Sequence, residues 1–176
     1  MKLLFSSILS AFLFFSIAIP ARAQVTAPNG IYLELLGNGL LYTINYDRFI
    51  SDDISLRGGF EYIGLAASSG TESASISMML IPITFNYFLT SHDHGKPGSS
   101  KFELGAGIVI VNISGSASGN AGELVSGSGT GIAGTATIGY RLQPSDGGFI
   151  FRIGFTPLIG AGGFLPFGGL SFGFAF

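Results

Sequence analysis

The residues of this chain that could carry chemistry are charged side chains set among alternating apolar positions. Glu103 stands between Phe102 and Leu104, and Arg152 stands between Phe151 and Ile153. Alternate side chains of a strand point to opposite faces, so each charge lies on the face opposite its large apolar neighbours. The same pattern predicts one polar face that carries Glu34, Asp47, Glu61 and Glu103 together with Arg57, Arg141 and Arg152.

Charges of both signs on one face should pair if that face encloses a narrow interior. An isolated charge in a low-dielectric interior is costly, and a partner of opposite sign offsets part of that cost. The seven residues therefore predict a hydrogen-bonded ion network that plugs the interior. A polar path for ions through the same interior is the alternative.

Nucleophiles and metal ligands are few in this sequence. The segment His92-Asp93-His94 holds both histidines, and its alternate residues could share a metal ion, but the spacing is not that of a zinc site. We interpret it as a solvated turn. A serine nucleophile needs a general base within reach, and no histidine is near Ser114, Ser116 or Ser126 in the sequence. We therefore expect no catalytic site, no metal and no cofactor.

The composition indicates a membrane protein that is not helical. Charged residues make up 10% of the chain, against roughly 25% in soluble domains, and the mean hydropathy is +0.56. Glycine accounts for 28 of the 176 residues, which argues against long helices. High hydropathy without a second long apolar run leaves a closed β-barrel, because only helices and closed barrels satisfy every backbone group in lipid. The absence of cysteine excludes disulfides and a lipidated cysteine anchor.

Residues 1–23 are predicted to be a secretory signal peptide, and residues 24–176 the mature barrel domain. Lys2 supplies the positive start, an apolar run follows, and Ala21-Arg22-Ala23 is a cleavage signature. An uncleaved anchor helix is the alternative. Removal of Lys2 and Arg22 leaves six basic residues beside ten acidic ones, a net charge near −4. No basic cluster remains that would bind nucleic acid.

Eight strand-like segments follow the signal peptide, most of them near the ~9–11 residues that a tilted membrane strand needs. An even number places both termini on the periplasmic side. The connections at 37–39, 66–74, 114–131 and 160–166 then face outward, and we expect 66–74 and 114–131 to be Ser/Gly-rich loops. Side chains fill the interior of an eight-stranded barrel, which favours the plug over the ion path. The segments are Ile31–Leu36, Leu40–Phe49, Ile54–Leu65, Ser75–Leu89, Lys101–Ile113, Ile132–Leu142, Phe149–Leu158 and Gly168–Phe176.

Aromatic and large apolar residues mark the surface that should face lipid. In the last segment they occupy every second position, at Leu170, Phe172, Phe174 and Phe176. A girdle of aromatic side chains is expected near the inner ends of the strands. It consists of Tyr46, Tyr87, Phe102, Tyr140 and Phe149. A soluble β-sandwich that buries these aromatics in its core is the alternative.

Four stretches carry a resemblance to a known family. They are Ile31-Tyr-Leu-Glu-Leu-Leu36, Tyr42-Thr-Ile-Asn-Tyr-Asp-Arg48, Lys101-Phe-Glu-Leu-Gly-Ala-Gly107 and Leu170-Ser-Phe-Gly-Phe-Ala-Phe176. The chain resembles the small eight-stranded outer-membrane barrels of the OmpA and OmpX type. The resemblance implies an all-β, antiparallel, up-and-down transmembrane barrel that is monomeric and integral to the bacterial outer membrane. It also implies that the barrel insertion machinery reads the C-terminal strand.

These observations predict a structural or surface-interaction role in the outer membrane, with a lumen plugged by side chains. The expected partners are outer-membrane lipid, the insertion machinery and a surface ligand bound by the outer loops. A narrow passive channel for small solutes or ions is the first alternative. A lipid-modifying enzyme is the second, and a soluble ligand-carrying barrel is the third.

Overall fold

The computed structural model describes residues 27–70, 72–90, 100–119 and 124–176. Eight antiparallel strands form a closed ring, in which each strand pairs with its neighbour and β10 returns to pair with β1. The ring consists of β1 (Asn29–Leu36), β2 (Tyr42–Ser51), β3 (Ile54–Ser69), β4 (Glu72–Thr90), β5 (Ser100–Ser118), β6 (Leu124–Leu142), β7 (Gly148–Phe155) and β10 (Gly168–Ala175). The predicted all-β, eight-stranded antiparallel barrel is confirmed. Within the described ranges, no helix has the length and apolarity to cross a bilayer.

The alternation seen in the sequence determines which side chains enter the barrel. In β10, Phe172 and Phe174 are exposed on the outer surface, whereas Ser171 and Ala175 are buried inside. Arg57 and Glu103 are likewise fully buried in the interior. This arrangement excludes the soluble sandwich, because no second layer within the described residues covers the large apolar side chains of the ring.

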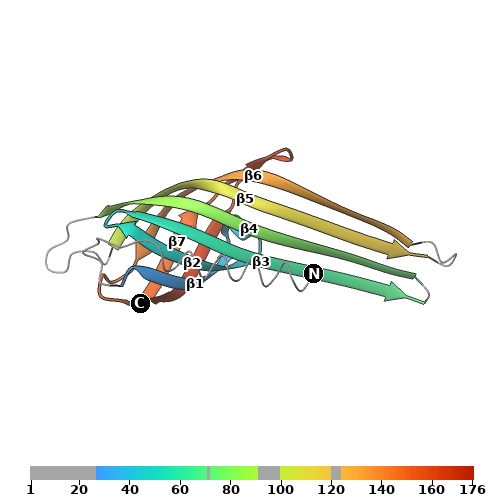
Figure 1. The fold of residues 1–176 in the computed structure, drawn as a ribbon, viewed down its shortest axis with the longest axis horizontal. Helices are drawn as coiled ribbons and strands as arrows, with labels where there is room; N and C mark the ends of the chain where they lie inside the picture. Colours follow the sequence, from blue (N-terminus) through green and yellow to red (C-terminus); the bar gives the residue numbers. More distant parts are fainter. Residues whose placement is uncertain (1–26, 71, 91–99, 120–123) are drawn as a thin grey trace.

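The strands of the ring differ greatly in length. β3, β4, β5 and β6 contain 16 to 19 residues, whereas β1, β2, β7 and β10 contain 8 to 10. Figure 1 shows the four long strands running side by side well beyond the rest of the barrel. We call the extension the projecting sheet, which comprises residues 62–69, 72–79, 112–118 and 124–130.

The projecting sheet corrects two predictions from the sequence. The loops expected at 66–74 and 114–131 are mostly strand. Ser73 pairs with Ser118 and Ser118 with Leu124, in a register that runs without a shift from the opposite end of the barrel. The small Ser, Gly and Ala residues resemble a linker in sequence, but their backbone groups form the ladder hydrogen bonds of a sheet.

Two connections form the low side of the barrel at the projecting end. β1 and β2 are joined through the 3₁₀ turn η1 (Gly37–Gly39), and β7 is followed by the short hairpin of β8 (Leu158–Gly160) and β9 (Gly163–Leu165). The strand expected to end at Leu158 therefore stops at Phe155. Strict alternation with the inward-facing Thr43 would also place Leu41 inside the barrel, but Leu41 is exposed and Leu40 is partly buried. Positive φ angles at Leu36 and Leu40 redirect the chain there.

Candidate functional site

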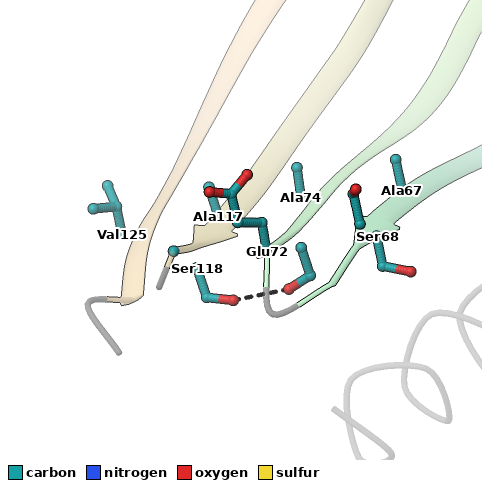
Figure 2. Close-up of a pocket in the computed structure, with 10 residues that line it drawn as sticks. Ala67, Ser68, Glu72, Ala74, Ala117, Ser118 and Val125 are labelled. Carbon is teal, nitrogen blue, oxygen red and sulfur yellow. Dashed lines mark hydrogen bonds between the residues drawn. The ribbon is translucent and has the colours of Figure 1, made fainter. Parts of the chain in front are cut away.

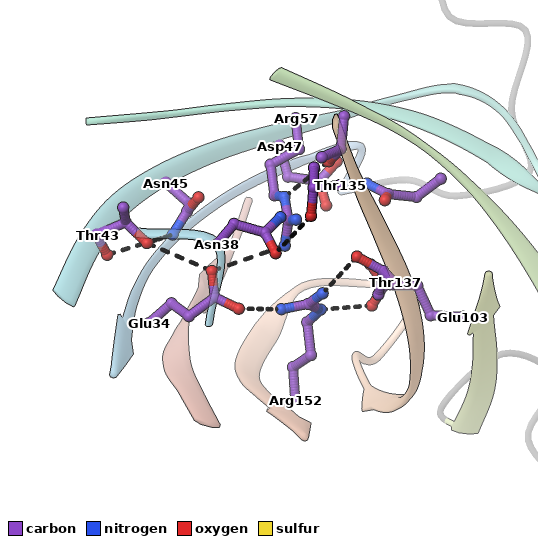
Figure 3. Close-up of polar contacts among 12 residues, drawn as sticks. Glu34, Asn38, Thr43, Asn45, Asp47, Arg57, Glu103, Thr135, Thr137 and Arg152 are labelled. Atoms are coloured by element: carbon purple, nitrogen blue, oxygen red, sulfur yellow. Dashed lines mark hydrogen bonds and ion pairs between the residues drawn. The ribbon is translucent and has the colours of Figure 1, made fainter. Parts of the chain in front are cut away.

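The middle of the lumen is occupied by Arg152 and two carboxylates from other strands. Its Nη1 lies 2.5 Å from Glu34 Oε1 on β1, and its Nε lies 2.6 Å from Glu103 Oε2 on β5. Figure 3 shows the guanidinium of Arg152 between these carboxylates and Thr137. Arg57 is more loosely attached, since its Nη1 lies 3.9 Å from Glu34 Oε2. All four charged side chains are buried, so they form one ion cluster across the barrel.

A second layer of charged and aromatic side chains lies in the lumen toward the end opposite the projecting sheet. Arg141 forms an ion pair and a hydrogen bond with Asp47. The guanidinium also stacks near aromatic rings, at 5.3 Å from the centroid of Phe88 and 5.6 Å from that of Phe49. Lys101 Nζ lies 4.2 Å from the Phe49 ring. Cation–π contacts of this kind hold two positive charges where the lumen is lined by aromatic faces.

The residues of this second layer include three that the sequence analysis missed. They are Lys101, Phe49 and Phe88, and each is buried. The alternation along each strand does predict that they point inward, because residues two apart share a face. Phe49 lies two residues after Asp47, and Lys101 lies two residues before Glu103. The expectation that all large apolar side chains face lipid left no place for a Phe side chain that points into the lumen.

Glu61 was expected to belong to the ion network, but it forms no ion pair within the described part of the chain and bonds to backbone amides. Its Oε1 instead accepts hydrogen bonds from the backbone amides of Leu41 and Tyr42, both at 3.3 Å. These contacts hold η1 inside the barrel, where Asn38 Oδ1 accepts a hydrogen bond from Thr135 Oγ1 on β6 at 3.3 Å. Gly39 is required there, because an added Cβ would overlap Thr43 and the Glu61 carboxylate.

Apolar side chains form a cluster inside the barrel at the projecting end. Leu80, Val109 and Leu158 are buried together, and partly buried residues pack against them. These partly buried residues are Leu40, Met78, Val111 and Phe167. We call the seven side chains the apolar cap. Beside it lies the low rim, a set of exposed apolar residues of the β1–β2 and β7–β10 connections that comprises Leu36, Leu41, Ile159, Phe164 and Leu165.

The aromatic residues predicted to form a girdle lie at the end opposite the projecting sheet. Phe102 and Tyr140 are cross-strand partners on β5 and β6, and Phe149 is the partner of Phe174. Tyr87 is also exposed, and Tyr46 donates a hydrogen bond to Asn29 Oδ1 at 2.8 Å. The C-terminal residues Phe172, Phe174 and Phe176 are exposed on the same outer surface. Contact with the membrane interface and with the insertion machinery stay predictions.

The outer face of the projecting sheet is polar, in contrast to the outer face of the barrel below it. On β4 the outward residues change from Phe85, Ile83 and Ile81 to Ser77, Ser75 and Ser73. Each of these serines has its hydroxyl 2.8–2.9 Å from a serine hydroxyl of β5. The β5 partners include Ser114 and Ser116, two of the three serines considered as nucleophiles; Ser126 lies opposite Ser116 on β6. His92, Asp93 and His94 lie outside the described residues.

The inner face of the projecting sheet is apolar, in contrast to the polar lumen below it. Leu65, Ile76 and Val125 are 66%, 52% and 65% exposed on this face. Figure 2 shows Ala74, Ala117 and Glu72 on one side of the sheet tip and Ser118 on the other. A hollow of about 620 Å³ lies at this tip. Both faces therefore invert their polarity where the strands leave the ring.

Comparison with known proteins identifies the fold. No protein-family model matches the sequence, and no curated protein matches it. The N-terminal β-barrel domain of Pseudomonas aeruginosa OprF is similar in structure, with a TM-score of 0.55 and 17% identity over 84% of this chain and 95% of that domain. Ail of Yersinia pestis, solved in complex with the heparin analogue sucrose octasulfate, has a TM-score of 0.49 and 12% identity over 84% and 93%. The chain has the fold of small outer-membrane β-barrels, and its apolar outer surface is consistent with the bacterial outer membrane.

Proposed function

We propose that this outer-membrane barrel has no open pore and acts through the sheet that it projects beyond the membrane. The observation that carries the proposal is the ion cluster, in which Arg152 joins carboxylates of β1 and β5 across the lumen. The cation–π layer lies on one side of this cluster, and the η1 turn and the apolar cap lie on the other. These contacts within the interior support a structural or surface-interaction role over transport.

The projecting sheet supports the second half of the proposal. In the orientation that we propose, the sheet faces the cell exterior and the turns at Ser51–Asp53 and Pro144–Gly147 face the periplasm. Long outer connections and short inner turns are typical of such barrels. The outer serine face ends the apolar band on β4, β5 and β6, as expected where strands emerge from hydrocarbon. The sheet would thus be the part that meets molecules outside the cell.

We propose no catalytic activity for this chain. The hydroxyls of Ser114 and Ser116 are engaged with Ser77 and Ser75, so they belong to a hydrogen-bonded ladder. A serine nucleophile would need a general base at hydrogen-bond distance. The geometry of the described residues supports a surface built for contact, and the lipid-modifying alternative has no support from it.

Conductance in planar bilayers tests the closed lumen. We expect the purified, refolded protein to give no steady current steps of nanosiemens order. The matched comparison is the double variant Arg152→Ala, Glu103→Ala, which shortens both partners of one ion pair together and leaves space in the middle layer. That variant should conduct more than the unmodified protein. Nanosiemens steps in the unmodified protein would overturn the proposal in favour of the narrow channel.

A further inference from the structure

The inner face of the projecting sheet is an apolar surface without a cover in the described part of the chain. Its side chains come from four strands and include Leu65, Ile76, Ile113 and Val125. Among residues 62–79, only Glu72 is charged. The backbone groups of the two middle strands are used in ladder hydrogen bonds on both sides. Such a surface can offer little besides apolar contact, and large exposed apolar patches of this kind mark binding sites.

This inner face is continuous with the lipid-facing surface of the barrel. Ile76 and Ile113 each lie two residues from a member of the apolar cap, Met78 and Val111, and on the same face of their strands. The cap also contains Leu40 and Leu158, which border the low rim in sequence. The low rim itself is exposed on the outer side, where Phe164 is 58% exposed. An apolar path therefore runs from the lipid side, over the low rim and the cap, to the inner face.

The polarity of the two sheet faces shows which neighbour suits this path. The outer face carries serine hydroxyls, so hydrocarbon is not expected to follow the strands on that side. On the low side the wall stops at η1 and the β8–β9 hairpin, and Figure 1 shows the long strands continuing past both. Hydrocarbon would therefore reach the inner face from this side.

A second copy of the chain is a poorer match for the same face. Four strands about 4.8 Å apart and about eight residues long give a face of about 500 Å². Two such faces together would bury about 1,000 Å², less than the roughly 1,200–2,000 Å² of stable interfaces. A single alkyl chain needs far less area. We infer that the inner face of the projecting sheet binds the acyl chain of an outer-leaflet lipid, which reaches it over the low rim.

The chain contains no tryptophan, so a single introduced tryptophan reports on its own surroundings. We would place it on the inner face with Ile76→Trp and on the outer face of the same strand with Ser75→Trp. Phe85→Trp, on the lipid-facing part of β4, serves as the positive control. Each full-length variant is reconstituted in phosphatidylcholine vesicles with and without bromine on the acyl chains. Heat-modifiable gel migration checks that each variant is folded.

We expect brominated lipid to reduce the fluorescence of Ile76→Trp nearly as much as that of Phe85→Trp, and to leave Ser75→Trp almost unchanged. Leu65→Trp, compared with Ala66→Trp on β3, repeats the test if Ile76→Trp fails to fold. Fluorescence of Ile76→Trp as resistant to bromine as that of Ser75→Trp would overturn the inference. Resistance combined with an emission shift that depends on protein density would assign the face to a second copy instead.

The route over the low rim is tested by placing charge on it. Adding Leu41→Asp and Phe164→Asp to Ile76→Trp should abolish its quenching, whereas the same pair added to Phe85→Trp should change little. Persistent quenching of Ile76→Trp would refute the route. The inference rests on the proposed orientation but not on the closed lumen, because a conducting barrel could still quench at Ile76→Trp.

Discussion

At the scale of single residues, Arg152 is the side chain on which the middle of the lumen depends. It is buried and contacts two carboxylates, Glu34 and Glu103, that come from different strands. A buried ion pair adds little net stability over a well-packed apolar core, but removing one partner leaves a buried charge without compensation. Loss of Arg152 would leave Glu103 without its ion-pair partner and Glu34 with only the looser contact to Arg57, so its effect should exceed that of any other single charge removal.

We predict that Arg152→Met lowers the free energy of unfolding by about 3–5 kcal/mol, the usual cost of breaking a buried pair. Urea unfolding in lipid vesicles, followed by heat-modifiable migration, measures it. Arg57→Met is the matched control, since Arg57 is equally buried but lies 3.9 Å from Glu34, which keeps Arg152 as its partner. The control should therefore cost clearly less. Equal or reversed effects would contradict the role given to Arg152.

The sequence predicts which residues enter the lumen far better than it predicts how they pair. Parity along each strand places Glu34, Arg57, Glu103 and Arg152 inside, as the structure shows. Pairing depends on barrel closure, which brings Arg152 to Glu34 across 118 residues of sequence. The different pairing of Glu61 has the same origin. Its partners are backbone amides just after the turn at 37–39, and the sequence predicts that turn but not that it folds into the barrel.

At the scale of elements, the projecting sheet is the part that the sequence misrepresents. Residues 114–131 are rich in Ser and Gly, which usually indicates a flexible linker. Yet Ser114, Ser116 and Ser118 occupy every second position, and this period of two is typical of a strand. The Ser- and Gly-rich composition of the segment hides that period. The neighbouring strand supplies the missing stabilisation, through ladder hydrogen bonds and paired hydroxyls.

Because the chain has no cysteine, introduced cysteines can test this element directly. We predict that Ser75→Cys with Ser116→Cys forms a disulfide on mild oxidation, since these residues are cross-strand partners with hydroxyls 2.9 Å apart. Ser75→Cys with Ser126→Cys should not, because two strand spacings, about 10 Å, separate them and disulfides need Cα atoms within about 7 Å. A gel shift with a maleimide polymer reports both. Similar cross-linking of the two pairs would indicate a flexible loop.

At the scale of the whole molecule, the closed ring follows from composition and alternation together. High hydropathy without a spanning helix leaves a barrel, and eight alternating segments give its strand number. The segments were placed correctly in the ring, but their lengths were not. The sequence does not mark where the long strands end, because serine suits both a loop and a sheet in water.

The orientation of the molecule is testable with the same cysteine-free chain. Glu72→Cys, exposed at the tip of the projecting sheet, should react with a membrane-impermeant maleimide on intact cells. Asp146→Cys, exposed in the turn between β6 and β7, should react only after the outer membrane is permeabilised. The opposite labelling pattern would place the projecting sheet in the periplasm and remove the basis for a surface role.

The unequal strands also make the molecule asymmetric about the barrel axis. Where the projecting sheet begins, β4 and β5 present a face of serine hydroxyls, whereas the β8–β9 hairpin presents exposed apolar side chains. A neighbouring protein that approaches β4 and β5 therefore meets hydroxyl groups, and one that approaches the hairpin meets apolar side chains. Rotation of the barrel about its axis thus changes the surface that it presents to neighbouring proteins. In a crowded membrane, copies of the molecule should therefore adopt preferred rotational orientations.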